Sequence, residues 1–147
     1  MGIKIVIEEP SPGEEDHLIV KCRNLSPEIM RLINALKTRD DSLIAYVDSE
    51  IHRISRADVF YIETVDNKTF LYCKQNVYES RQKLYELEEA LAEGDFLRVS
   101  KSVIVNLSKI KSLAPALSGR LEAKLANNEK VIISRQYVPA LKKSLGI

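Results

Sequence analysis

Short apolar runs separated by polar turn residues dominate the chain from residue 43 onward. Residues 43–47 (LIAYV) and 50–55 (EIHRIS) are expected to form short strands, and the Asp48-Ser49 pair between them is typical of a tight turn. Similar strands are expected at residues 59–63, 69–74, 77–80, 96–100, 103–107, 110–113, 120–125 and 131–133. The pattern predicts a mainly β domain over residues 43–147.

Two short segments of this domain have a helical period instead. Residues 84–91 place three leucines on one helical face, and Gly94 ends that pattern. Residues 138–145 form a second apolar stripe, in which Pro139 suits the first helical turn. The class is therefore α+β overall, with strands in the majority and two short helices.

A different pattern occupies residues 1–42. Residues 3–7 and 17–22 are apolar and rich in β-branched side chains, so they predict a hairpin. Ser26 is a candidate N-cap and Pro27 fits the first helical position, which predicts a helix to about Lys37. The polar residues 38–42 then predict a boundary, so the first 42 residues are expected to form a small ββα unit.

The expected helix carries an apolar stripe formed by Ile29, Leu32, Ile33 and Leu36. This stripe could pack on the hairpin of its own chain or pair with a second copy. Because so few residues make a poor independent core, a role in forming a homodimer is favoured. The segment is also too short for a phosphoacceptor receiver domain.

Charge is distributed unevenly along the chain. Residues 97–147 carry ten basic and two acidic side chains, a net charge of +8, whereas residues 1–96 carry a net charge of −7. A segment this basic attracts polyanions. Charge alone is equally compatible with nucleic-acid binding and with an ordinary solvated surface.

The residues of enzyme and metal sites are missing from the pattern. Two histidines, His17 and His52, and the distant Cys22 and Cys73 have no zinc-site spacing, and five scattered glycines form no phosphate loop. Neither enzymatic activity, a cofactor nor a small-molecule substrate is expected. Without a CxxC pair, a signal peptide or a long apolar run, a reduced cytoplasmic protein is the simplest interpretation.

Two polar runs could contact nucleic acid. Ser100 and Lys101 precede the apolar run VIVNL, and lysine and serine can reach phosphates or guanine acceptors. Arg135 and Gln136 lie at the expected start of the last helix, and these two side chain types can read guanine and adenine. A polar turn and a solvated helix end explain the same residues equally well.

Taken together, these runs resemble the LytTR family of bacterial DNA-binding domains. The resemblance covers about residues 50–146 and rests on YIE (residues 61–63), FLRVSKSVIVNLSKIKSL (residues 96–113) and GRLEAKLANNEKVIISRQY (residues 119–137). It implies a stack of small antiparallel β-sheets with little helix. Loops of that stack would enter successive major grooves and bend double-stranded DNA.

The resemblance also implies three contact segments. They comprise Asn67, Lys68 and Thr69 after YIE, Ser100 and Lys101 before VIVNL, and Arg135 and Gln136 in the SR segment. Many family members have His-Arg or His-Asn in place of Ser100-Lys101, and a second arginine in place of Gln136. These departures predict a base preference different from that of those members.

The resulting hypothesis is a sequence-specific transcription regulator that binds duplex DNA as a dimer on repeated half-sites. It resembles stand-alone LytTR regulators with a short N-terminal extension, which are often restrained by a small multi-pass membrane protein. The alternative is a protein-interaction module that regulates a membrane partner or another regulator without binding DNA. RNA binding ranks third, because the aromatic signature of RNA-recognition motifs is missing.

Overall fold

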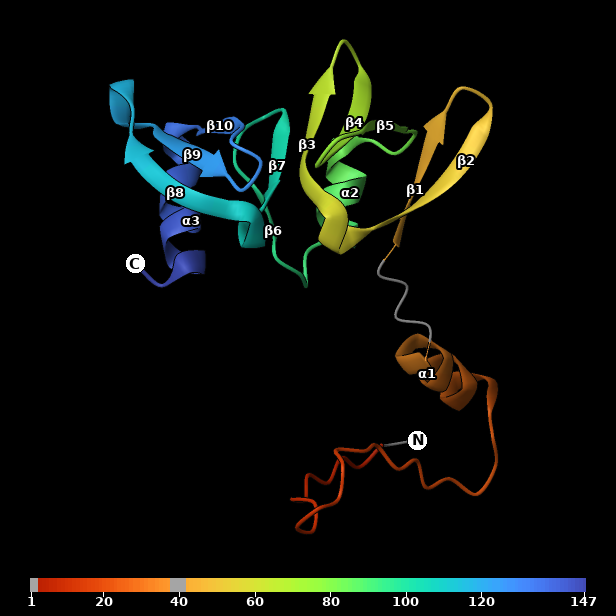
Figure 1. Cartoon of the computed structure of the whole chain (residues 1–147). Helices are drawn as coiled ribbons and strands as arrows, with labels where there is room; N and C mark the ends of the chain where they lie inside the picture. The colour runs from red at the N-terminus through yellow and green to blue at the C-terminus, as the bar shows by residue number, and fades with distance from the viewer. Residues whose placement is uncertain (1–2, 38–41) are drawn as a thin grey trace. The chain divides into compact units, whose positions relative to one another are not determined.

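The computed structural model describes residues 3–37 and 42–147 (Figure 1). The chain divides into two compact units, Met1–Arg39 and Asp40–Ile147. The boundary predicted at residues 38–42 falls largely outside the described residues, so the predicted division after residue 42 stays a prediction.

The N-terminal unit contains one helix, α1 (Pro27–Lys37), among its described residues. The Ser26 hydroxyl oxygen accepts a hydrogen bond from the Ile29 amide at 3.2 Å, so Ser26 is the N-cap that the sequence predicts. Ile29 and Ile33 are half-buried and Leu32 is 48% exposed. The side chain of Leu36, the fourth member of the predicted stripe, lies outside the described part.

The predicted hairpin before this helix is wrong. Neither residues 3–7 nor residues 17–22 form a strand, and no residue from 3 to 33 is buried. Ile7 is 93% exposed and Leu18 is 78% exposed. An isolated two-stranded hairpin is only marginally stable in water, and residues 3–33 include no buried side chain against which a hairpin could pack.

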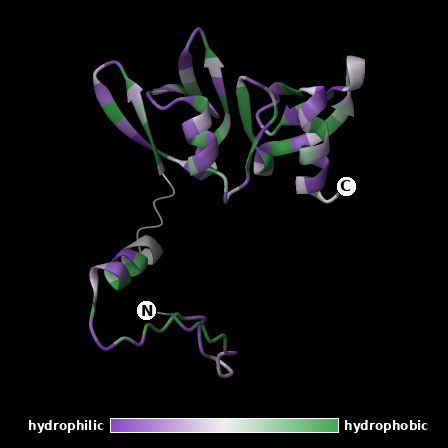
Figure 2. Ribbon diagram, turned by 180° about the vertical axis from the view of Figure 1, so that it is seen from behind, coloured by the Kyte–Doolittle hydropathy of each residue, from purple (hydrophilic) through white to green (hydrophobic). Residues whose placement is uncertain are grey.

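The C-terminal unit consists of two antiparallel sheets, with strand orders β2-β1-β5-β4-β3-β7-β6 and β10-β9-β8. The strands are β1 (Ser42–Val47), β2 (Glu50–Ser55), β3 (Val59–Val65), β4 (Lys68–Cys73), β5 (Val77–Ser80), β6 (Phe96–Arg98), β7 (Val103–Asn106), β8 (Ile110–Pro115), β9 (Leu121–Leu125) and β10 (Lys130–Ile133). The predicted mainly β class is confirmed. Figure 2 shows hydrophobic and hydrophilic residues mixed along the strands of both sheets.

Short helical segments connect and cover these strands. The helices are α2 (Leu84–Ala90) and α3 (Val138–Leu145), and the 3-10 turns are η1 (Arg56–Asp58), η2 (Leu107–Lys109), η3 (Leu117–Gly119) and η4 (Arg135–Tyr137). The two predicted helices are present, but the last one begins at Val138, so Arg135 and Gln136 lie in the preceding 3-10 turn. None of the helices in the described ranges is long and apolar enough to cross a membrane.

Strand β7 contributes to two separate hydrophobic cores. Its Ile104 packs under α2 with Leu87 and Leu91, all at most 1% exposed. Val103 and Val105 point the other way and pack with the three-stranded sheet and α3. Because successive side chains of a strand face opposite sides, four consecutive buried residues place β7 where both cores meet.

A buried polar residue ends β7. The Asn106 amide nitrogen donates to the Val59 carbonyl at 2.8 Å, and its oxygen accepts from the backbone and hydroxyl of Ser108. Asn106 is 2% exposed, and a buried amide requires such partners. These bonds join the end of β7 and η2 to the start of β3.

Candidate nucleic-acid interface

The first predicted contact segment is the turn between β3 and β4. Asp66 and Asn67 form this two-residue turn with φ angles of 51° and 63°. Positive φ at both positions is the geometry that matches the twist of a hairpin, and Asp and Asn tolerate it. Asn67 and Lys68 are exposed. The turn therefore presents an amide and an ammonium group to solvent.

Thr69 differs from its two neighbours. Its side chain is 5% exposed, and its hydroxyl lies 3.3 Å from the hydroxyl of Thr64 on the paired strand. A hydroxyl in this position supports the hairpin from within. Asn67 and Lys68 are accordingly the members of the first segment with side chains available to a partner.

The second segment is the loop of residues 99–102, which enters β7. Lys101 is exposed, whereas Ser100 is half-buried and its hydroxyl oxygen accepts from the Ser102 amide at 3.2 Å. The Val103 carbonyl closes the loop, because the amides of Val99 and Ser100 both donate hydrogen bonds to it, at 3.0 and 3.4 Å. This tight reversal places Lys101 at its tip.

The third segment is η4, which contains Arg135 and Gln136, both exposed. Gly119 lies beside it with a φ of +75°, and a Cβ added to Gly119 would come within 3.4 Å of the Arg135 Cγ and Cδ atoms. The aliphatic part of the Arg135 side chain therefore lies next to Gly119, which has no side chain. Gly119 is a neighbour of the site that the sequence alone did not indicate, although a glycine between Ser118 and Arg120 is typical of a turn.

Two backbone hydrogen bonds bring the three segments together. The Thr64 amide near the end of β3 donates to the Ser102 carbonyl at 2.9 Å, and the Ser134 amide next to Arg135 donates to the Val99 carbonyl at 2.8 Å. The β3–β4 turn and the loop before β7 lie at the same end of the sheet, the upper end in Figure 1, because Glu63 pairs with Val103. The loop is thus the central one of the three.

Electrostatics around the loop favour an anionic partner. Lys68, Lys101 and Arg135 are exposed cations on three different segments. Carboxylates are also near, because Asp66 precedes Asn67 and Glu63 accepts a hydrogen bond from the Tyr72 hydroxyl at 3.4 Å. Burial and Glu63 raise the pKa of Tyr72, so this hydroxyl stays protonated and acts as a donor.

Within residues 3–37 and 42–147, no three His, Cys, Asp or Glu side chains are grouped to hold a metal ion. Cys22 is exposed and Cys73 is half-buried, and both are free thiols. What the surface can do is donate hydrogen bonds and positive charge to an extended anion.

Comparison with known proteins gives one family and several relatives. The family model described as the LytTr DNA-binding domain matches residues 49–146. A solved LytTr DNA-binding domain from Bacillus cereus superposes with a TM-score of 0.69 at 25% identity, covering 74% of this chain and 99% of that domain.

Two relatives are similar over most of their length. Both are uncharacterized HTH-type transcriptional regulators of Staphylococcus aureus, from strains NCTC 8325 and MRSA252. They are 29% and 28% identical over 135 residues, which cover 90% of this chain and 91% of each relative. The likeness therefore extends into the N-terminal unit, beyond the residues that the family model matches.

Proposed function

Because this chain belongs to the LytTR family of DNA-binding domains, we propose that it is a sequence-specific transcription regulator that reads duplex DNA with three loops. The family consists of non-enzymatic DNA-binding regulators, and the proposal assigns no reaction to the chain. Its site of action is the chromosome, which implies a cytoplasmic location.

The observation that carries the proposal is the joining of three exposed polar segments by the Thr64–Ser102 and Ser134–Val99 backbone bonds. A surface that reads DNA must hold its contact groups in one fixed arrangement. We assign Asn67 and Lys68 to one groove edge, Ser100 and Lys101 to the centre, and Arg135 and Gln136 to the next groove. Thr69 supports the first segment from inside the hairpin.

The helix-turn-helix wording in the relatives' names does not fit this mode of binding. In the described part of the chain, α2 and α3 are separated by strands β6 to β10, so they do not form a pair of adjacent helices. Lys101 lies instead on the loop before β7, and Arg135 lies on the 3-10 turn η4. We therefore propose contact through loops rather than through a recognition helix.

The first test replaces single contact residues. Lys101→Ala and Arg135→Ala should each weaken binding to a cognate duplex by about 1–3 kcal/mol if they contact bases, with the fold unchanged. Binding is measured by gel shift or fluorescence anisotropy, and the fold by circular dichroism.

Lys74→Ala is the matched control. Lys74 is also an exposed lysine, but it follows β4 at the end opposite to the Asn67 turn. Its replacement should leave affinity nearly unchanged. Wild-type affinity in both Lys101→Ala and Arg135→Ala would refute the assignment of these contacts.

A second candidate function is a protein-interaction module that acts without DNA. The exposed apolar residues of the N-terminal unit favour it, since Ile5 is 81% exposed and Leu18 is 78% exposed. The partner would be a second regulator or a small multi-pass membrane protein. No gel retardation of upstream DNA at low salt would support this candidate, whereas retardation with a steep salt dependence supports the first.

We also propose that the regulator is a homodimer formed through α1. Leu32 is 48% exposed and Met30 is 39% exposed on a single short helix. Such a helix gains stability by burying its apolar residues against another element, and a second copy provides one. Two LytTR domains held together in this way would read repeated half-sites.

A further inference from the structure

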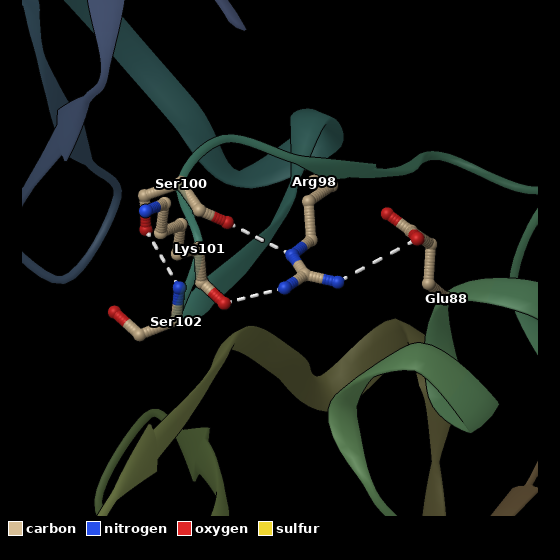
Figure 3. Close-up of polar contacts among 5 residues, drawn as sticks. All are labelled: Glu88, Arg98, Ser100, Lys101 and Ser102. Atoms are coloured by element: carbon tan, nitrogen blue, oxygen red, sulfur yellow. Dashed lines mark hydrogen bonds and ion pairs between the residues drawn. The ribbon is translucent and has the colours of Figure 1, made fainter.

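Arg98, the last residue of β6, turns its guanidinium group back onto the loop that follows it (Figure 3). Its Nε atom donates to the Ser100 carbonyl at 2.8 Å, and its Nη2 atom donates to the Lys101 carbonyl. Its Nη1 atom lies 3.6 Å from a carboxylate oxygen of Glu88 on α2. All three nitrogens are thus engaged within the protein, and the side chain is 21% exposed.

The bonds of Arg98 complete a frame around the central loop. The carbonyls of Val99 and Ser102 accept from the backbone amides of Ser134 and Thr64. The two carbonyls between them, those of Ser100 and Lys101, accept from Arg98. Every carbonyl from residue 99 to residue 102 is therefore held, and Arg98 holds the two that carry the proposed contact side chains.

We propose that Arg98 is a positioning residue that shapes the central loop and thereby determines how well the protein discriminates between DNA sequences. This inference rests on the proposed function, because it concerns the same surface. A guanidinium group is a planar fork that can direct two bonds at once, which fixes the direction of both peptide groups. With the carbonyls turned inward, Lys101 projects outward from the loop.

Glu88 orients this fork. Its carboxylate is 44% exposed, and an ion pair this open contributes little stability by itself. Its effect is to occupy the third nitrogen and to balance the charge of Arg98. Arg98 therefore acts through Ser100 and Lys101 and does not serve as a phosphate ligand.

The test uses Arg98→Lys in the full chain, because lysine keeps the charge and loses the fork. The probes are a duplex selected by the wild-type protein from a random-sequence pool and a scrambled duplex of equal length and composition. Affinity for the selected duplex should fall about tenfold, the size of one lost base contact. Affinity for the scrambled duplex and the slope of log affinity against log salt should stay at the wild-type values.

Two further variants bracket this result. Glu88→Gln should reduce the ratio of selected to scrambled affinity in the same direction but by less than Arg98→Lys. Arg53→Lys is the matched control, since Arg53 is exposed on the edge strand β2, which is far from β7 in the strand order. The ratio of selected to scrambled affinity in Arg53→Lys should equal that of the wild type.

Three outcomes would overturn the proposal. An unchanged ratio in Arg98→Lys would show that the fork does not affect sequence discrimination. An equal loss on both duplexes would show a general structural role. In Arg98→Gln, the slope of log affinity against log salt could decrease by the amount expected for about one lost phosphate contact. That result would show that Arg98 itself contacts DNA.

A measurement without DNA separates this inference from the proposed function. Amide hydrogen exchange at Thr64 and Ser134, which donate to the loop carbonyls, should be faster in Arg98→Lys than in wild type. The Leu125 amide, bonded to the Glu129 carbonyl at 2.8 Å in another turn, should exchange at the same rate in both. If the wild type selected no duplex, the proposed function would fail. Unchanged amide exchange at Thr64 and Ser134 in Arg98→Lys would refute the positioning role, whatever the result with DNA.

Discussion

The residues that shape the proposed DNA-reading surface differ from those that contact its partner. Arg98, Thr69 and Gly119 contact or lie beside the segments that carry the exposed side chains. Lys101 and Arg135 are exposed and carry the charge. Substitutions in the first group should alter binding through geometry, and those in the second through lost contacts.

Gly119→Ala is predicted to weaken DNA binding more than its effect on stability explains. A φ of +75° is strained for alanine by about 1–2 kcal/mol. The added Cβ would also contact the Arg135 Cγ and Cδ atoms at 3.4 Å, so it would fill the space beside this side chain and limit its rotamers. Binding measured by anisotropy should fall severalfold in conditions where urea denaturation shows the variant fully folded.

Gly146→Ala provides the comparison. Gly146 has a φ of +74° at the end of α3, and an added Cβ there meets nothing within 4 Å. This variant should lose a similar amount of stability and bind DNA as the wild type does. Equal binding losses in the two variants would contradict a specific role for the gap beside Arg135.

Residue types in the sequence indicated which side chains could contact DNA, but not how they are held. Lys101 and Arg135 could be proposed because few side chains recognise guanine and phosphate. The role of Arg98 could not, since its partners are backbone carbonyls whose positions depend on a chain reversal. Burial of Thr69 was equally hidden, because it depends on which face of β4 is covered.

Among the elements, the strands of the C-terminal unit were the most predictable. Short apolar runs such as residues 43–47 and 131–133 are local properties of the sequence, and alternate residues of these strands are buried in the structure. The predicted hairpin at residues 3–7 and 17–22 failed for the opposite reason. Its apolar residues satisfy the local pattern, yet no side chain among residues 3–33 is buried.

Helix α1 is the element whose surface should determine self-association. Leu32→Glu is predicted to weaken the proposed dimer, because it would place a charge within the apolar interface. Sedimentation velocity over a range of concentrations measures the effect. Arg31→Glu introduces the same side chain at an exposed neighbouring position and should leave association unchanged. A concentration-independent mass for the wild type would contradict the dimer.

At the scale of the whole molecule, charge is segregated along the chain. The last 51 residues carry a net charge of +8, while the chain as a whole carries +1. The basic part includes the central loop and η4, so the positive potential surrounds two of the three contact segments. The fold class could be predicted because the characteristic runs at residues 61–63, 96–113 and 119–137 span both sheets.

This segregation predicts a steep dependence of DNA affinity on salt. If four or more phosphates are neutralised, affinity should fall about 100-fold or more between roughly 50 and 200 mM monovalent salt. Titrations of one selected duplex at several salt concentrations give the slope. Lys74→Ala should reproduce the wild-type slope. An affinity that does not change with salt would argue against contacts to DNA phosphates.

The backbone frame around residues 99–102 also has a consequence for how such regulators diverge. Amides of Thr64 and Ser134 hold the loop through its carbonyls, and these bonds do not depend on the side chains at positions 100, 101 or 136. Mutations at those positions can therefore change the preferred operator one residue at a time while the scaffold persists. After gene duplication, a copy could acquire a separate set of target promoters without passing through an unfolded intermediate sequence.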